Sequence, residues 1–134
     1  MGNTISSNPI DIAVSGLRAQ SLNMNVIANN IANANTSRTA NGQPYRRQQV
    51  VLSTAEELAG VAVDGVDQDT ATQFKTMYSP GHPDADKNGH VKMPNVELPR
   101  EMMHMVVASR AYQANAAVLK RYQESLDLAL ELLR

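Results

Sequence analysis

The stretch LPREMMHMVVASRAYQANAAVLKRYQESLDLALELLR (residues 98–134) decides the fold of this chain. Apolar side chains recur at every seventh position along it: Leu98, Met105, Tyr112, Leu119, Leu126 and Leu133. A seven-residue apolar repeat is typical of helices that pack along one another. No Gly or Pro follows Pro99, so we predict one helix about 50 Å long at about 1.5 Å per residue. Such a helix needs a partner along its whole apolar seam.

A second, shorter helix is predicted near the other end of the chain. Asn8-Pro9 opens it, because an Asn side chain caps free amide groups and Pro suits the first helical turn. Apolar residues again recur at heptad spacing, with one companion position: Ile10, Leu17, Met24, Ile27 and Ile31. The pattern predicts a helix over residues 9–34 that pairs with residues 98–134 in a coiled-coil-like way. Because this helix is shorter, apolar surface on the longer one is left for other chains.

The middle of the chain, residues 36–97, differs from both ends because it contains most of the Gly and Pro residues. Apolar and polar residues alternate over three short stretches, which predicts strands there: residues 49–52, 61–63 and 73–78. Asp64-Gly65 and Ser79-Pro80-Gly81 are typical of the turns between such strands. We expect a small sheet rather than a domain that is stable alone.

These patterns predict an α+β fold that is mainly α. We divide the chain into an N-terminal helical part (residues 1–35), a β-rich middle segment with loops (residues 36–97) and a C-terminal helix (residues 98–134). Residues 9–34 and 98–134 pack as one terminal-helix domain, so the subunit is elongated. Hydrophobic residues make up 43% of the chain but aromatic residues only 4%, which favours helices packed on neighbours over a self-sufficient core.

The composition excludes several classes of protein. There is no Cys, which removes disulfides, cysteine-bound zinc and thiol catalysis. The net charge is −1 without a basic patch, so we expect no nucleic-acid partner. No apolar run approaches the roughly 20 residues that span a bilayer, so we expect no direct membrane insertion. Residues 1–12 lack the basic start and apolar run of a cleavable secretory signal.

No set of residues suggests catalysis or metal binding. The three histidines, His82, His90 and His104, have no metal-ligand spacing, and no serine or carboxylate pair stands beside an obvious base. We therefore expect no enzyme, no catalytic or metal-binding residues and no cofactor. Asp84–Gly89 (DADKNG) matches the first half of a calcium loop, but position 12 of that loop is Asn95 instead of Glu. We favour a tight turn there and keep a calcium-binding module as an alternative.

Two short patterns near the N-terminus are too common to decide a function. Met1–Ser6 fits the myristoylation pattern, and Asn35-Thr36-Ser37 fits the glycosylation sequon. An acylated Gly2 would make the chain a coiled-coil adaptor held at a membrane, which remains a second alternative.

Asparagines crowd the end of the first predicted helix, although Asn is a poor helix former. Four of them are candidate packing residues: Asn25, Asn29, Asn30 and Asn33. Three of the four follow one another at four-residue spacing and share a helix face. Glu or Lys would serve a solvated face better, so we favour amides that are buried against other backbones or other subunits.

Five segments carry a resemblance to a known family. SGLRAQ (residues 15–20) and MNVIANNIAN (residues 24–33) resemble the N-terminal signature of bacterial flagellar rod and hook proteins. Residues 42–46, 80–96 and 109–115 narrow the resemblance to the proximal rod members of the flagellar basal-body rod family. Residues 80–95 argue against the nearest alternative, another rod segment protein.

The resemblance implies a structural subunit of the flagellar basal body. Such a protein is exported through the flagellar type III apparatus and polymerises helically in the periplasm, where the rod transmits motor torque to the hook and filament for motility. The implied partners are copies of itself, other rod proteins and the basal-body membrane ring region. The apolar ladders and the four asparagines above would then be assembly and helix-packing residues.

Overall fold

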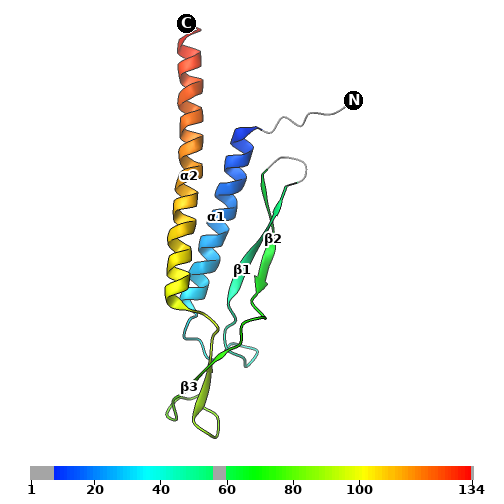
Figure 1. The fold of residues 1–134 in the computed structure, drawn as a ribbon, viewed down its shortest axis with the longest axis vertical. Coiled ribbons are helices and arrows are strands. Elements are labelled where there is room, and N and C mark those ends of the chain that lie inside the picture. The colour runs from blue at the N-terminus through cyan, green and yellow to red at the C-terminus, as the bar shows by residue number, and fades with distance from the viewer. Residues whose placement is uncertain (1–7, 56–59, 134) are drawn as a thin grey trace, which may run out of the picture.

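The computed structural model describes residues 8–55 and 60–133 and shows two long helices with two small antiparallel sheets (Figure 1). The elements in chain order are α1 (Pro9–Ala32), β1 (Gln48–Thr54), β2 (Val61–Gln68), β3 (Lys75–Tyr78), β4 (His90–Met93) and α2 (Leu98–Glu131). The two helices pack together and the sheets lie between them in the sequence. The predicted α+β, mainly α fold is confirmed.

Helix α1 begins at the predicted residue and ends two residues before the predicted end. The Asn8 side chain accepts a hydrogen bond of 3.1 Å from the Ile10 amide, and Pro9 occupies the first turn. At the other end Asn33 caps the helix, and its Nδ2 donates to the Asn29 carbonyl at 2.9 Å. An Asn side chain that binds backbone groups competes with further helical bonds, which explains the earlier end.

Helix α2 runs antiparallel to α1 and is the longer of the two (Figure 1). It begins at Leu98, as predicted, and its helical bounds end at Glu131, three residues before the predicted end. The buried apolar residues of the two helices are Ala13, Ala19, Val26, Ile27 and Ala108, and three of these five are alanines. Such side chains let the two helix axes approach closely along the seam.

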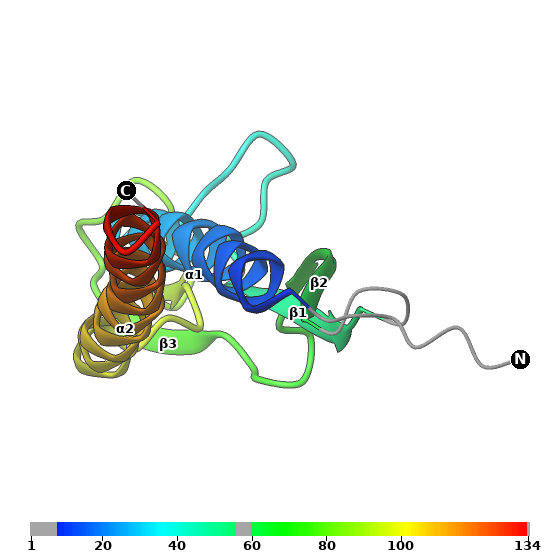
Figure 2. The ribbon, with the colours of Figure 1, turned by 90° about the horizontal axis from the view of Figure 1, so that it is seen from above.

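The β1–β2 hairpin packs against the side of α1 that faces away from α2 (Figure 2). Strands near residues 49–52 and 61–63 are confirmed, but the predicted turn at Asp64-Gly65 is wrong because both residues lie inside β2. Val51 pairs with Gly65 and Leu52 with Val63, so Asp64 is an extra residue, or bulge. The chain reverses instead between Thr54 and Val61.

The second sheet, β3 with β4, lies beyond the end of the helix pair where α1 stops and α2 starts (Figure 1). Tyr78 ends β3, and the predicted turn at residues 79–81 follows it. The β4 strand, at His90–Met93, is absent from the sequence prediction, since its alternating polar residues and short length give a weak signal. Among the described residues, no helix combines the length and the apolar character that crossing a membrane requires.

Candidate assembly site

A buried polar cluster holds α1, β1 and α2 together where they meet. The Glu101 side chain, in the first turn of α2, is fully shielded from solvent. Its Oε1 accepts a hydrogen bond of 2.7 Å from Nε of Arg47, and its Oε2 accepts one of 2.9 Å from Nδ2 of Asn30. Since both carboxylate oxygens have a donor, the buried charge is compensated inside the fold.

Asn30 is the residue of α1 that enters this cluster, and its amide group makes four hydrogen bonds. Nδ2 also donates to the Gln48 carbonyl at 2.8 Å, while Oδ1 accepts from the Gln48 amide and from the Tyr45 hydroxyl, each at 2.9 Å. Burial, and then the nearby charge of Glu101, raise the pKa of Tyr45, so this hydroxyl stays protonated and remains a donor. Asn30 thus binds the start of β1 as a neighbouring strand would.

Asn95, just before α2, extends the cluster toward the segment that follows β2. Its Oδ1 accepts a hydrogen bond of 2.7 Å from the Arg47 amide, and its Nδ2 donates to the carbonyls of Asp69 and Thr72. Arg46 donates to the same Asp69 carbonyl at 2.9 Å. In the part of the chain that the structure describes, no buried side-chain nitrogen or oxygen lacks a hydrogen-bond partner. The cluster is therefore a fully hydrogen-bonded structural joint between these elements.

The segment that matches half of a calcium loop forms a turn, as we favoured. The Gly89 amide donates to the Asp86 carbonyl at 3.0 Å, and the Asp86 carboxylate accepts from the amides of Asn88 and His90. These two amides, that of His90 first, hold the pKa of Asp86 below its usual value. Within residues 8–55 and 60–133, no group of three or more His, Asp or Glu side chains is placed to hold a metal ion.

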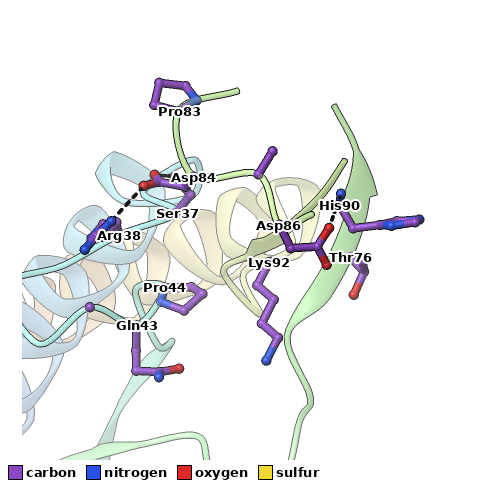
Figure 3. Close-up of a pocket in the computed structure, with 12 residues that line it drawn as sticks. Ser37, Arg38, Gln43, Pro44, Thr76, Pro83, Asp84, Asp86, His90 and Lys92 are labelled. Carbon is purple, nitrogen blue, oxygen red and sulfur yellow. Dashed lines mark hydrogen bonds and ion pairs between the residues drawn. The ribbon is translucent and has the colours of Figure 1, made fainter. Parts of the chain in front are cut away.

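Asp84 joins this turn to the loop after α1 at one side of an open pocket of about 690 Å³ (Figure 3). Its carboxylate accepts a hydrogen bond of 2.7 Å from the Ser37 hydroxyl and lies 3.6 Å from the Arg38 guanidinium. The Ser37 hydroxyl, with Arg38 contributing less, lowers the pKa of Asp84. The carboxylate is thus used to connect two loops. The Met1–Ser6 pattern lies outside the described residues.

The structure separates the four candidate asparagines. Asn30 is buried in the polar cluster, and Asn33 is half-buried at the end of α1. Asn25 and Asn29 are exposed on this subunit. Burial against another backbone, one of the two predicted possibilities, therefore describes Asn30, while contact of the exposed pair with other subunits stays a prediction.

The residues of the predicted apolar ladders differ in how far they are exposed to solvent. Ile27 is buried, six members are half-buried (Ile10, Leu17, Met24, Ile31, Met105 and Leu119), and four are exposed on this subunit (Leu98, Tyr112, Leu126 and Leu133). Met102 and Leu130, which the heptad pattern places in a supporting row, are exposed too, but sequence reasoning missed further exposed apolar residues on α2: Met103, Val106, Val107, Val118 and Leu128. The run MMHMVV was the available signal, since it places apolar side chains all around the helix.

Comparison with known proteins identifies the family. Residues 10–38 match the family model described as "Flagella basal body rod protein", and residues 87–132 match "Flagellar basal body rod FlgEFG protein C-terminal". The flagellar basal-body rod protein FlgC of Salmonella typhimurium is 44% identical, with 93% of this chain and 96% of the relative covered. The FlgC proteins of Borreliella burgdorferi (38% identical; 93% and 95% covered) and Aquifex aeolicus (34% identical; 92% and 94% covered) are also similar. The chain belongs to the FlgC family of flagellar basal-body rod proteins.

Proposed function

We propose that this chain is a structural subunit of the proximal flagellar rod and that it joins the rod through exposed side chains of α2. As a basal-body rod protein it assembles with other rod and basal-body proteins, serves motility and is not an enzyme. We infer further that it forms a helical polymer with copies of itself in the periplasm after type III export, with the membrane ring region at the basal end.

The end of α2 that projects past α1 carries this proposal (Figure 1). Tyr122 is half-buried, but residues 123–133 are all exposed. Several of these residues are leucines, and Leu132 and Leu133 are more than four-fifths exposed. A helical end with this much uncovered apolar surface gains from burial against another chain, at about 25 cal/mol per Å² of apolar area.

The charges on this end also favour a partner. Residues 122–131 contain Glu124, Asp127 and Glu131 and no Lys or Arg. Glu131, in the last turn of α2, opposes the helix dipole at a cost of roughly 0.3–1 kcal/mol. Asp127 lies just before that turn, whereas Glu124 is paired with Lys120 at 3.9 Å. A neighbouring subunit that brings positive side chains would remove this cost while it covers the leucines.

The exposed amides of Asn25 and Asn29 offer a second contact surface, on α1. Neutral donors and acceptors can bind a neighbouring backbone without the desolvation cost of burying a charge. Contacts spread along both helices would share the load that the rod carries, because torque is then distributed over many side chains instead of one hinge.

The experiment replaces one exposed leucine in a strain that lacks the native gene. Leu128→Asp is expected to abolish swimming, because it puts a charge on the surface to be buried, while the protein is still exported. Leu128→Met keeps an apolar side chain of similar volume and should swim normally. Electron microscopy of basal bodies would show rods that stop at the membrane ring in the Asp variant. Intact rods and normal swimming with Leu128→Asp would refute the proposed role of α2.

A further inference from the structure

We propose that two matched contacts, Asn30 with Glu101 and Gly16 with Asn115, set the register between α1 and α2. This register device belongs to the single subunit and goes beyond the proposed role in the rod. It assigns to the buried polar cluster a positional role, which is distinct from adding stability.

The apolar seam alone defines the register poorly. Its ladder residues repeat every seven positions on both helices, so a slip by one heptad, about 10 Å along the axis, again places ladder residues against ladder residues. Many buried residues of the seam are also small: Ala13, Ala19 and Ala108. Small aliphatic contacts of this kind discriminate weakly between two alignments, so the register needs another determinant.

The first contact is polar and has no substitute one heptad away. A slip brings Ala108 or Pro94 to the position of Glu101. Either residue would leave the buried amide of Asn30 and the Nε of Arg47 without the carboxylate that they bind now. Buried polar groups that lose a partner cost roughly 1–3 kcal/mol each, and more when charged, so the slipped alignments are disfavoured.

The second contact is steric. Gly16 faces the side chain of Asn115 so closely that a Cβ on Gly16 would lie 2.7 Å from Nδ2 of Asn115. Asn115 therefore occupies a notch that the missing side chain leaves open. A slip by one heptad would bring Ala108 or Tyr122 to this notch. Ala108 is too small to fill the notch, and Tyr122 is much larger than the Asn115 side chain that the notch now holds.

The two contacts agree with each other in spacing. Gly16 and Asn30 are two heptads apart on α1, and Glu101 and Asn115 are two heptads apart on α2. Antiparallel helices in one alignment satisfy both contacts together, whereas any other alignment breaks both. Two fixed points along a seam define its register and its direction, as single polar residues do in coiled coils.

A variant that replaces the polar cluster by apolar side chains tests whether the cluster sets the register of the two helices. Because a buried ion pair adds little net stability, the variant Asn30→Leu/Arg47→Met/Glu101→Leu is expected to stay folded. Its melting temperature should be lower than that of the native chain, because the Gln48 backbone and the Tyr45 hydroxyl lose the Asn30 side chain. Spin labels at Arg18→Cys and Gln113→Cys report the register, and the chain has no other Cys. The native background should give one distance. The variant should add a second population, displaced by about 10 Å along the helix axis.

A second pair of variants keeps the test decisive if the triple variant does not fold. A methyl group at position 16 would only turn aside the amide end of Asn115, so the test uses the larger Gly16→Val. Gly16→Val should also add a displaced population, and the additional change Asn115→Ala should restore one distance by making room for the new side chain. Asn25→Ala changes an exposed position of α1 outside both contacts, so it serves as the control with one distance. The proposal would be overturned by one unchanged distance in both the triple variant and Gly16→Val, or in Gly16→Val alone if the triple variant does not fold. Failure of Asn115→Ala to restore one distance in Gly16→Val would also overturn it. Loss of swimming plays no part in this readout, so failure of the proposed rod function would be seen separately.

Discussion

Oδ1 of Asn95 accepts a hydrogen bond of 2.7 Å from the backbone amide of Arg47. Asn95 precedes α2 and Arg47 precedes β1, so this bond joins two segments that are far apart in the sequence. Because Nδ2 of the same side chain binds the carbonyls of Asp69 and Thr72, one buried amide connects three stretches of backbone. The approach to α2 is therefore fixed by hydrogen bonds as much as by apolar packing.

Replacement of Asn95 by Ala is expected to lower the free energy of unfolding by about 1–3 kcal/mol, since the partly buried Arg47 amide and Thr72 carbonyl lose their hydrogen bonds to its side chain. Urea unfolding of the purified chain measures this difference. Asn25→Ala is the matched control, because Asn25 is exposed, and it should change stability by less than about 0.5 kcal/mol. Equal effects of the two substitutions would contradict the role of Asn95.

A hydrogen bond to Ser15 links the start of β2 to α1. The Ser15 hydroxyl donates to the Ile12 carbonyl at 2.8 Å and accepts from the Val61 amide at 3.1 Å. Ser15→Ala should therefore increase amide exchange at Val61 several-fold, for a loss of about 1 kcal/mol. Ser125→Ala, which removes only a bond within α2, should leave exchange at Val61 unchanged. Unaltered exchange in both variants would show that the hairpin is held by other contacts.

Acid should weaken the turn after β2. The amide and hydroxyl of Thr72 donate to the Asp69 carboxylate and lower its pKa in the folded chain below the unfolded value of 3.8. A lowered folded pKa adds stability above the unfolded pKa, and this stability is lost as the pH falls through the folded value. The melting temperature of the native chain should thus fall more steeply below about pH 4 than that of Asp69→Asn. Parallel acid profiles for the two proteins would rule out this contribution.

Hydrogen exchange of the dilute monomer should divide α2 near Tyr122. Residues 101–122 pack against α1 or the polar cluster and should be protected, whereas residues 123–131 should exchange rapidly because they are exposed and have no helix beside them. Strong protection across the whole of residues 101–131 in the monomer would contradict this division. In assembled rods the same end should become protected.

The helices were predictable because their signals are local. Heptad spacing and caps at Asn8 and Pro9 depend on neighbours within a few turns, so α1 and α2 begin where expected. The Asp64-Gly65 error has a local cause too, since the same pair suits a turn or a bulge and only the pairing of Val51 with Gly65 decides between them.

The polar cluster was harder to predict because its members are distant in the sequence. The sequence named Asn30 as one of four candidates and placed Asn25, Asn29 and Asn33 on one face, but it could not show that Asn30 is the buried asparagine of α1. That burial depends on partners in β1 and α2. Glu101 looks like an ordinary acidic residue of a first helical turn. Its burial follows from the approach of Arg47, which no local pattern encodes.

The overhang of α2 makes the two ends of the subunit unlike. If two overhangs met each other, their leucines would be covered, but the negative charges of Asp127 and Glu131 on one copy would come near those of the other. In the proposed rod, contact between unlike ends is therefore favoured over a symmetric pair. Such a contact repeats without closing on itself, so nothing in the contact limits the number of subunits that can be added. The length of the proximal segment would then have to be set by a different molecule.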